Sequence, residues 1–128
     1  MGLDKVHTAQ APAAIGPYSQ AIRAGDYLFC SGQIPLLAQT GEIVAGGIKQ
    51  QTRQVLENLL AVLTAAGLDF AAVVKTTIYL VDLADFAIVN EIYAGHCSDP
   101  APARATVQVA ALPKGVLVEI DAIAYFGK

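Results

Sequence analysis

Two residues of opposite charge, each set in an apolar stretch of the C-terminal half, are the best candidates for chemistry in this chain. Arg104 follows Pro102 and opens a strand-like stretch, so its guanidinium is expected where a loop meets a sheet. A planar, permanently charged guanidinium suits bidentate capture of a carboxylate. Glu119 lies inside the apolar segment 116–120, where a carboxylate needs a partner or a function because burying it alone is costly.

Both residues also have a purely structural explanation. Glu119 could form an ion pair with a neighbouring lysine or arginine, and Arg104 could pair with Asp99, Asp121 or Glu119 itself. The pattern of residues does not decide between these ion pairs and a ligand site, so both remain open at this point.

The familiar catalytic motifs are missing from the sequence. His7 and His96 have no motif partner nearby, and Cys30 and Cys97 lack the spacing of metal ligands. There is no nucleophile elbow around a serine, no His-Glu-x-x-His helix and no glycine-rich phosphate loop. We therefore expect neither a metal ion nor a cofactor.

The composition is more apolar than one small core requires. The chain has 128 residues, which fits a single domain over 1–128, and 55% of them are hydrophobic. Only 15% are charged, against about 25% in an average soluble domain. A subunit interface would cover the excess, so we expect a homo-oligomer with a large apolar interface.

Charge and hydropathy exclude several classes of partner. The net charge is −3 and the basic residues are scattered singly, which gives no footprint for nucleic acid. No stretch approaches the roughly 18–20 apolar residues of a membrane span. Two lone cysteines without a partner motif favour the reducing cytoplasm.

Two helices should position the charged residues. Apolar residues at helical spacing predict a helix over 48–66, ended by Gly67 in a favoured capping position. A second helix is expected over about 84–95, capped by Asp82 or Asp85. Its apolar stripe consists of Phe86, Val89, Ile92 and Tyr93.

Strands should provide the rest of the frame. Their predicted ranges are 18–23, 27–32, 73–81, 105–110 and 116–126, with a possible short strand before the first helix. No element is assigned before residue 11, where His7 would lie in a mobile segment. The economical architecture is an α+β domain in which two helices cover one face of a mixed sheet and subunit packing covers the other.

Alternation along the last strand separates its charged from its apolar residues. One face is purely apolar and should pack under the helices: Val116, Val118, Ile120, Ala122, Ala124 and Phe126. Glu119 falls on the other face. It should therefore point away from the helices, toward the expected subunit interface.

Short segments spread over nearly the whole chain are similar to those of one known family. They are the stretches 12–21, 31–35, 74–77 with 82–83, 86–90, 102–104, 112–115 and 119–124. In order and spacing they resemble the RidA/YjgF family of enamine/imine deaminases. The resemblance implies a chorismate-mutase-like fold, assembled as a homotrimer with a central β-barrel and clefts between subunits.

The resemblance also implies an activity and its residues. The activity is hydrolysis of 2-iminobutanoate and 2-iminopropanoate, which arise from PLP enzymes, to 2-oxo acids and ammonia. Arg104 would hold the substrate carboxylate and Glu119 would position or activate the attacking water. The other implied substrate-binding residues are Tyr18, Ser31, Gly32, Asn90 and Thr106. Thr106 stands where relatives often have a cysteine, which rules out thiol chemistry there.

Two other functions belong to different classes. A non-catalytic regulatory module could bind 2-oxo acids through Arg104 without turning them over. A ribonuclease or translation inhibitor is the third possibility, and the acidic balance of the chain speaks against it.

Overall fold

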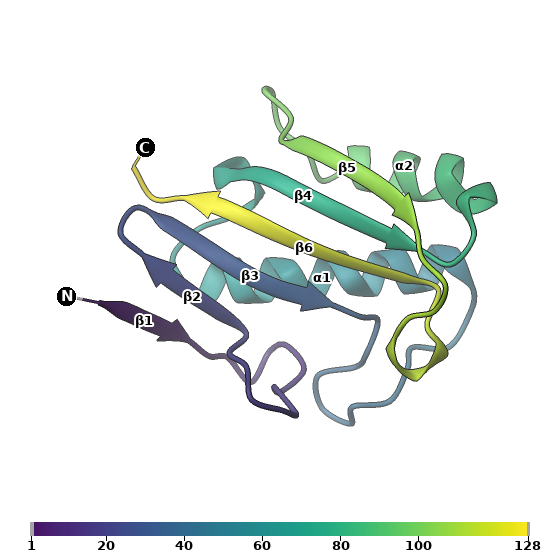
Figure 1. The fold of residues 1–128 in the computed structure, drawn as a ribbon, viewed down its shortest axis with the longest axis horizontal. Helices are drawn as coiled ribbons and strands as arrows, with labels where there is room; N and C mark the ends of the chain where they lie inside the picture. Colours follow the sequence, from purple (N-terminus) through teal and green to yellow (C-terminus); the bar gives the residue numbers. More distant parts are fainter. Residues whose placement is uncertain (1, 128) are drawn as a thin grey trace.

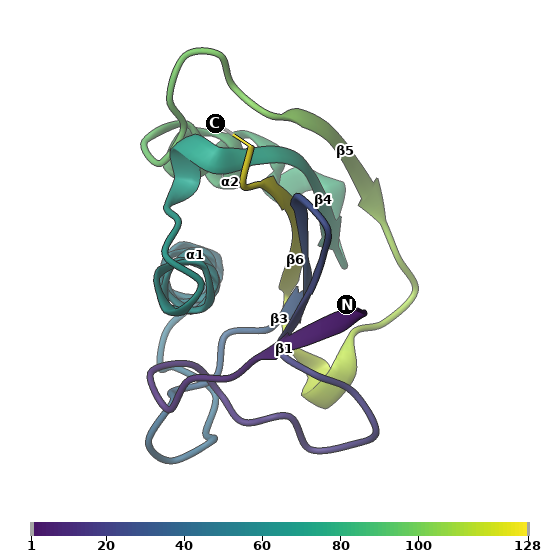
Figure 2. The ribbon, with the colours of Figure 1, turned by 90° about the vertical axis from the view of Figure 1, so that its left-hand side faces the viewer.

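The computed structural model, which describes residues 2–127, is a six-stranded mixed sheet with both helices on one face (Figures 1 and 2). The helices are α1 (Ile48–Ala65) and α2 (Phe86–Ala94), with short 3₁₀ turns at Phe70–Ala72, Leu83–Asp85 and Pro113–Gly115. The strands are β1 (Leu3–Val6), β2 (Ala21–Ala24), β3 (Tyr27–Gln33), β4 (Val73–Leu80), β5 (Ala103–Gln108) and β6 (Val118–Tyr125).

The last strand occupies the middle of the sheet. The strand order is β1-β2-β3-β6-β4-β5, and β6 runs antiparallel to both β3 and β4. Strands β3 and β4 therefore run in the same direction, and α1 makes the crossover between them. The second crossover, through α2, joins β4 to the parallel edge strand β5. This confirms the predicted α+β class, with two helices on one face of a mixed sheet.

The core lies between α1 and the centre of the sheet. The helix buries one stripe, which includes Val55, Leu59 and Val62, and β6 buries Val118 and Ile120 beneath it. Every second residue of β6 is buried, and the residues between them are half-buried or, at Tyr125, exposed. The predicted division of that strand into a helix-facing apolar side and an outer side is therefore confirmed.

Local capping explains where α1 ends. Gly67 adopts a positive φ of 83°, a conformation that costs other residues energy. The amide of Leu68 then bonds back to the Leu63 carbonyl at 2.8 Å, which satisfies a carbonyl at the helix end. The predicted end of this helix agrees with the structure.

The N-terminal part of the sheet corrects two predictions. No element was expected before residue 11, yet residues 3–6 form β1, which pairs antiparallel with β2. His7 lies in the loop that follows this strand. The strand expected over 18–23 begins only at Ala21. Just before this strand, the buried Gln20 side chain bonds to backbone groups of residues 8–12 and so ties the preceding loop to the sheet.

The outer face of the sheet carries exposed apolar side chains. Tyr27, Phe29, Val74 and Tyr125 are all exposed on strands β3, β4 and β6. Several large apolar residues gathered on one sheet face are typical of a surface that packs against another one. No helix of residues 2–127 is both long and apolar enough to cross a membrane.

Candidate active site

The edge strand β5 directs Arg104 and Thr106 to the helix side of the sheet. In the parallel pairing with β4, Arg104 lies opposite Thr76 and Thr106 lies opposite Ile78. Thr76 and Ile78 are buried under the helices. Residues opposite one another in a sheet share a face, so Arg104 and Thr106 point the same way as these two.

Helix α2 holds the guanidinium of Arg104. Its Nη1 donates a hydrogen bond of 2.6 Å to Oδ1 of Asn90. The guanidinium carbon also lies 5.5 Å from the ring centroid of Phe86 and 5.3 Å from that of Tyr93, within range of cation–π attraction. Spacings of four and three residues put 86, 90 and 93 on one helix face.

The side chains that contact the guanidinium of Arg104 are uncharged, whereas the guanidinium itself carries a permanent positive charge. Among residues 2–127 the hydrogen bond described for it goes from one guanidinium nitrogen to an amide oxygen, and Arg104 as a whole is exposed. The expected alternative of an ion pair with Asp99, Asp121 or Glu119 has no support in that part of the chain. Asn90, Phe86 and Tyr93 thus form an uncharged cradle around the guanidinium. This cradle leaves the positive charge available to an anionic ligand.

A buried hydrogen bond fixes this face of α2 against the sheet. The hydroxyls of Tyr93 and Thr76 lie 2.6 Å apart beneath the guanidinium. Burial raises the pKa of Tyr93, so its hydroxyl stays neutral. The Thr106 hydroxyl oxygen is also buried, and the part of the chain that the structure describes offers it no hydrogen-bond partner.

Glu119 emerges on the opposite, outer face. It lies opposite Tyr79 in the pairing of β6 with β4, and it is half-buried. Burial, followed by the charge of Asp121, raises the pKa of the Glu119 carboxyl. A carboxylate with a raised pKa is a stronger base than that of an ordinary glutamate, because its pKa lies closer to neutral pH.

An irregularity in β3 makes room for this carboxylate. The register between β3 and β6 shifts between Cys30 and Gln33, which places Ser31 and Gly32 in a bulge. A β-carbon added to Gly32 would overlap the Glu119 carboxylate. The glycine is therefore needed for close approach of the side chain.

Two hydrogen bonds from Ser31 connect the bulge to the loop that contains Tyr18. The Ser31 hydroxyl donates a hydrogen bond of 2.6 Å to the carbonyl of Ser19, and its amide donates one of 3.0 Å to the carbonyl of Gln20. Tyr18 itself is 51% exposed, so it is not part of the core.

The residues expected at the site thus fall into two groups on opposite faces of the sheet. The guanidinium group consists of Asn90, Arg104 and Thr106 on the helix side of β5. The carboxylate group consists of Tyr18, Ser31, Gly32 and Glu119. Strand β4 separates β5 from β6, so one copy of the chain does not bring Arg104 and Glu119 into a common cleft.

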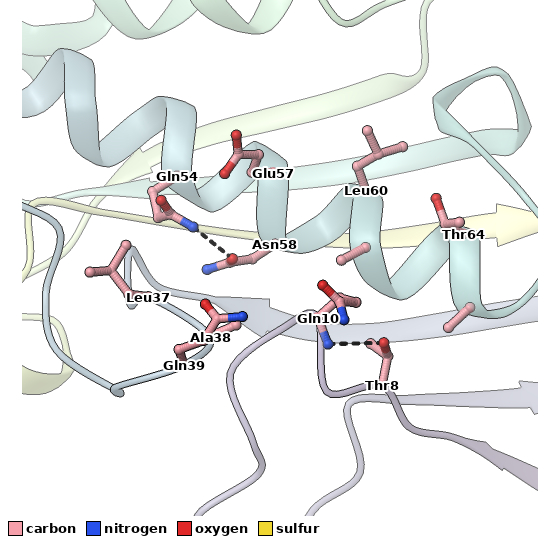
Figure 3. Close-up of a pocket in the computed structure, with 12 residues that line it drawn as sticks. Thr8, Gln10, Leu37, Ala38, Gln39, Gln54, Glu57, Asn58, Leu60 and Thr64 are labelled. Atoms are coloured by element: carbon pink, nitrogen blue, oxygen red, sulfur yellow. Dashed lines mark hydrogen bonds between the residues drawn. The ribbon is translucent and has the colours of Figure 1, made fainter.

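The hollows of a single chain lie elsewhere. A groove of about 530 Å³ runs between α1, the segment at Thr8 and Gln10, and the loop 37–39 (Figure 3). Polar atoms at its base are engaged within the protein, because Asn58 accepts a hydrogen bond from Gln54 and donates to the Leu36 carbonyl. Two further hollows lie between α1 and α2 and beside Phe126. Neither Arg104 nor Glu119 lines any of these three.

Neither the Cys30 thiol nor a metal cluster offers competing chemistry within residues 2–127. Burial, with the charge of Asp121, raises the pKa of Cys30 to about 12, so this thiol stays protonated and unreactive. Within residues 2–127, no group of three or more His, Cys, Asp and Glu side chains could hold a metal ion.

Sequence reasoning missed four residues around the site. Phe86 and Tyr93 were assigned to an apolar stripe, yet Phe86 is 39% exposed, and both rings lie near Arg104. The spacing of residues 86, 90 and 93 could have found this cradle. Asp121 and Tyr79 are joined by a hydrogen bond of 3.0 Å beside Glu119, and only the pairing of β4 with β6 discloses that contact.

Comparison with known proteins decides the family. The model of the family described as Endoribonuclease L-PSP matches residues 8–126. The human 2-iminobutanoate/2-iminopropanoate deaminase is 49% identical over 122 residues, which cover 95% of this chain and 89% of the human one. The chain belongs to the RidA/YjgF family.

Solved structures of RidA/YjgF proteins share the whole fold. RidA from the Antarctic bacterium Psychrobacter sp. is 48% identical, with a TM-score of 0.91 over 95% of this chain and 98% of that one. TdcF of E. coli, solved with bound serine, is 46% identical, with a TM-score of 0.87 over the same shares of the two chains. The chorismate-mutase-like fold expected from the sequence is confirmed by this likeness.

Proposed function

We propose that this RidA/YjgF protein is an imine deaminase, a hydrolase that acts on C=N bonds. Its substrates are 2-imino acids such as 2-iminobutanoate and 2-iminopropanoate, which PLP-dependent enzymes release, and its products are 2-oxo acids and ammonia. The observation that carries the proposal is the Arg104 guanidinium, which is held by neutral partners and keeps donors free. The mouse and human relatives, which are 51% and 49% identical to this chain, are both named 2-iminobutanoate/2-iminopropanoate deaminase, and this supports the proposal.

Arg104 would bind the substrate carboxylate. A forked guanidinium matches the two carboxylate oxygens, and the fixed position of Arg104 against α2 would orient the imine carbon. Thr106 lies two residues further along the same face, and its unpartnered hydroxyl could donate to or accept from the substrate. Neither step requires a cofactor or metal.

A second copy of the chain would complete the cleft. We propose a homotrimer with a central β-barrel, in which the guanidinium group of one subunit meets the carboxylate group of the next. The exposed apolar residues on the outer sheet face favour such packing. So does the placement of Arg104 and Glu119 on opposite faces of one sheet.

Glu119 would transfer one proton in each turnover. The imine reacts in the form protonated at nitrogen. A water adds to its carbon, and the carboxylate takes a proton from the water as the C–O bond forms and the C=N bond becomes a single bond. The same proton then passes to the amino nitrogen, the C–N bond breaks, and ammonia leaves. The remaining hydroxyl proton passes to the released ammonia as the carbonyl forms. General acid–base help of this kind contributes about 10²–10⁴-fold.

Competition with a chemical trap tests the proposal. Threonine dehydratase generates 2-iminobutanoate in the presence of semicarbazide, and an active deaminase diverts the imine to 2-oxobutanoate before the trap reacts. We expect Arg104→Ala to lower the rate by about 100-fold or more, because substrate orientation is lost. The variant should remain folded by circular dichroism.

The matched control is Arg53→Ala, which removes an exposed arginine from α1. It should divert the imine as the unaltered protein does. A wild-type protein that fails to outcompete semicarbazide would refute the deaminase proposal.

A binding module without turnover is the second candidate. The serine bound to TdcF favours it, because an amino acid there is held as a ligand. Calorimetric binding of 2-oxobutanoate, lost in Arg104→Ala and unaccompanied by any rate enhancement, would support this role in place of catalysis. The ribonuclease named by the family model is less favoured, since the chain is acidic with a net charge of −3.

The same proposal extends to the setting of the protein. Residues 1–128 would form one domain that acts in the cytoplasm, where its two free cysteines remain reduced. Its partners would be further copies of the chain and small 2-imino or 2-oxo acids.

A further inference from the structure

Beside Glu119, a second carboxylate on the same strand is held in place by a phenol. Asp121 lies two residues after Glu119 on β6, so both side chains stand on the outer face. The Tyr79 hydroxyl donates a hydrogen bond of 3.0 Å to Oδ2 of Asp121. The proposed reaction assigns no role to the hydrogen bond between them.

The pairing of β4 with β6 explains how the contact forms. Tyr79 lies directly opposite Glu119, while Thr77 lies opposite Asp121. The tyrosine side chain therefore reaches diagonally across the sheet to the next outer-facing residue, a separation that a long aromatic side chain can span. Its hydroxyl holds the Asp121 carboxylate next to the strand position that carries Glu119.

We propose that Asp121, held by Tyr79, is a positioning residue whose negative charge controls the ionisation of Glu119. The inference rests on the proposed deaminase function, in which Glu119 takes and returns a proton. A like charge at a fixed place disfavours a second carboxylate and makes Glu119 the stronger base. Asp121 itself touches no substrate in this scheme.

Three neighbours respond to the charge of Asp121 in the same direction. Burial and then Asp121 raise the pKa of both Glu119 and Cys30. Burial and then the hydrogen bond to Asp121 raise the pKa of Tyr79, so this phenol remains a donor over the working range. These directions agree with a carboxylate that the Tyr79 hydrogen bond holds close to Glu119.

Among the residues that the structure describes, few other titratable groups lie near this face. Strand β4 contributes Lys75, which donates to the Thr77 hydroxyl at 3.1 Å, together with Tyr79. Strand β3 contributes Tyr27, which lies opposite Tyr125 near the end of β6, whereas the Cys30 thiol lies on the helix side in the core. In the proposed trimer Arg104 of a second copy would also face Glu119. Its attraction opposes the effect of Asp121, and the experiment must therefore use the assembled protein.

The test compares Asp121→Asn, Tyr79→Phe and Asp4→Asn with the unaltered protein. Asparagine keeps the shape of the side chain and removes its charge. Asp4 is exposed on β1, which β2 and β3 separate from β6, so its substitution removes the same charge from a remote place. Two quantities are measured: the pH profile of kcat/KM for imine hydrolysis, and the titration of the Glu119 carboxyl carbon by NMR.

The sign of the expected shift follows from the physical cause. Removal of a like charge lowers the pKa of Glu119, so the base form persists to lower pH. In Asp121→Asn the acid limb of the kcat/KM profile and the NMR midpoint should both move to lower pH. The rate at the plateau should fall by less than about tenfold, because Glu119 becomes a weaker base but remains in place.

Tyr79→Phe should move both quantities in the same direction by a smaller amount, since it frees Asp121 without removing its charge. Asp4→Asn should move neither. If Asp121→Asn does not fold, the Tyr79→Phe comparison still decides the question. Midpoints that coincide in the unaltered protein, Tyr79→Phe and Asp121→Asn would overturn the inference.

The NMR titration also separates this inference from the proposed activity. The resonance of Glu119 is assigned from its loss in Glu119→Gln, and its midpoint is measured without any turnover. A protein that fails to hydrolyse imines refutes the deaminase proposal, while an unshifted Glu119 midpoint refutes the role of Asp121.

Discussion

The contact between Gly32 and Glu119 shows how one missing side chain can shape a site. Gly32 has no positive φ, so its place in β3 is not explained by a left-handed backbone. It is explained by space, because atoms of the Glu119 side chain beyond its β-carbon occupy the position where a β-carbon of residue 32 would stand. The bulge in β3 and the carboxylate of β6 therefore depend on each other.

A double-mutant cycle tests this dependence. Gly32→Ala should destabilise the protein by about 1–3 kcal/mol in urea unfolding, because the overlap forces either the backbone or Glu119 to move. In a Glu119→Ala background the overlapping atoms are gone, and the same substitution should cost about 1 kcal/mol less, or even stabilise the strand. Equal costs in the two backgrounds would show that the contact does not limit residue 32.

At the scale of elements, long polar side chains from α1 hold the segments that no strand or helix stabilises. Asn58 is buried at the middle of α1 and donates hydrogen bonds to the carbonyls of Ile34 and Leu36, at 3.2 and 2.9 Å. Gln51 accepts a hydrogen bond from the Leu117 amide at the start of β6. These three bonds tie the loop after β3 and the residue before β6 to the helix, and so fix the strands that carry Gly32 and Glu119.

Removing the Asn58 amide should loosen the loop after β3. We expect Asn58→Ala to lower the free energy of unfolding by about 2–3 kcal/mol, because one buried and one partly buried carbonyl lose their donors. Gln54→Ala is the matched control on the same helix, since it removes a single bond from the groove side and should cost less than about 1 kcal/mol. Urea unfolding followed by circular dichroism measures both. Similar losses in the two variants would contradict this account.

At the scale of the whole molecule, the sheet separates the two halves of the proposed site. Arg104 is cradled by α2 on the helix side of the edge strand, and Glu119 stands on the outer face of the central strand. Core side chains fill the space between β6 and the helices, so residues 2–127 leave no passage from one face of the sheet to the other. A cleft that uses both residues must therefore lie between copies of the chain.

Hybrid assemblies test this sharing of the site. Arg104→Ala and Glu119→Gln subunits, each inactive alone, are unfolded together and refolded as a mixture. In randomly assembled rings about a quarter of the clefts should combine an intact arginine from one subunit with an intact glutamate from the next, which restores about a quarter of the activity. Each variant refolded alone is the control. Hybrids detected by mass spectrometry but devoid of activity would refute a shared cleft.

The periodic spacing of apolar residues in the sequence was enough to predict single helices and strands and the side that each of them buries. The helical spacing before Gly67 predicted α1, and the alternation around Glu119 correctly placed this residue on the outer face. These patterns are local, since each depends on one element burying one of its sides. The candidate residues Arg104 and Glu119 were found by the same logic, as charges in apolar surroundings.

Tertiary structure alone decided which of these residues meet. The strand β1 carries no alternation of buried and exposed residues, and it exists because its backbone pairs with β2. The cradle of Arg104 and the contact between Tyr79 and Asp121 join residues on different elements. Their partners are chosen by strand order and register, which depend on how the whole chain packs and not on any single stretch of sequence.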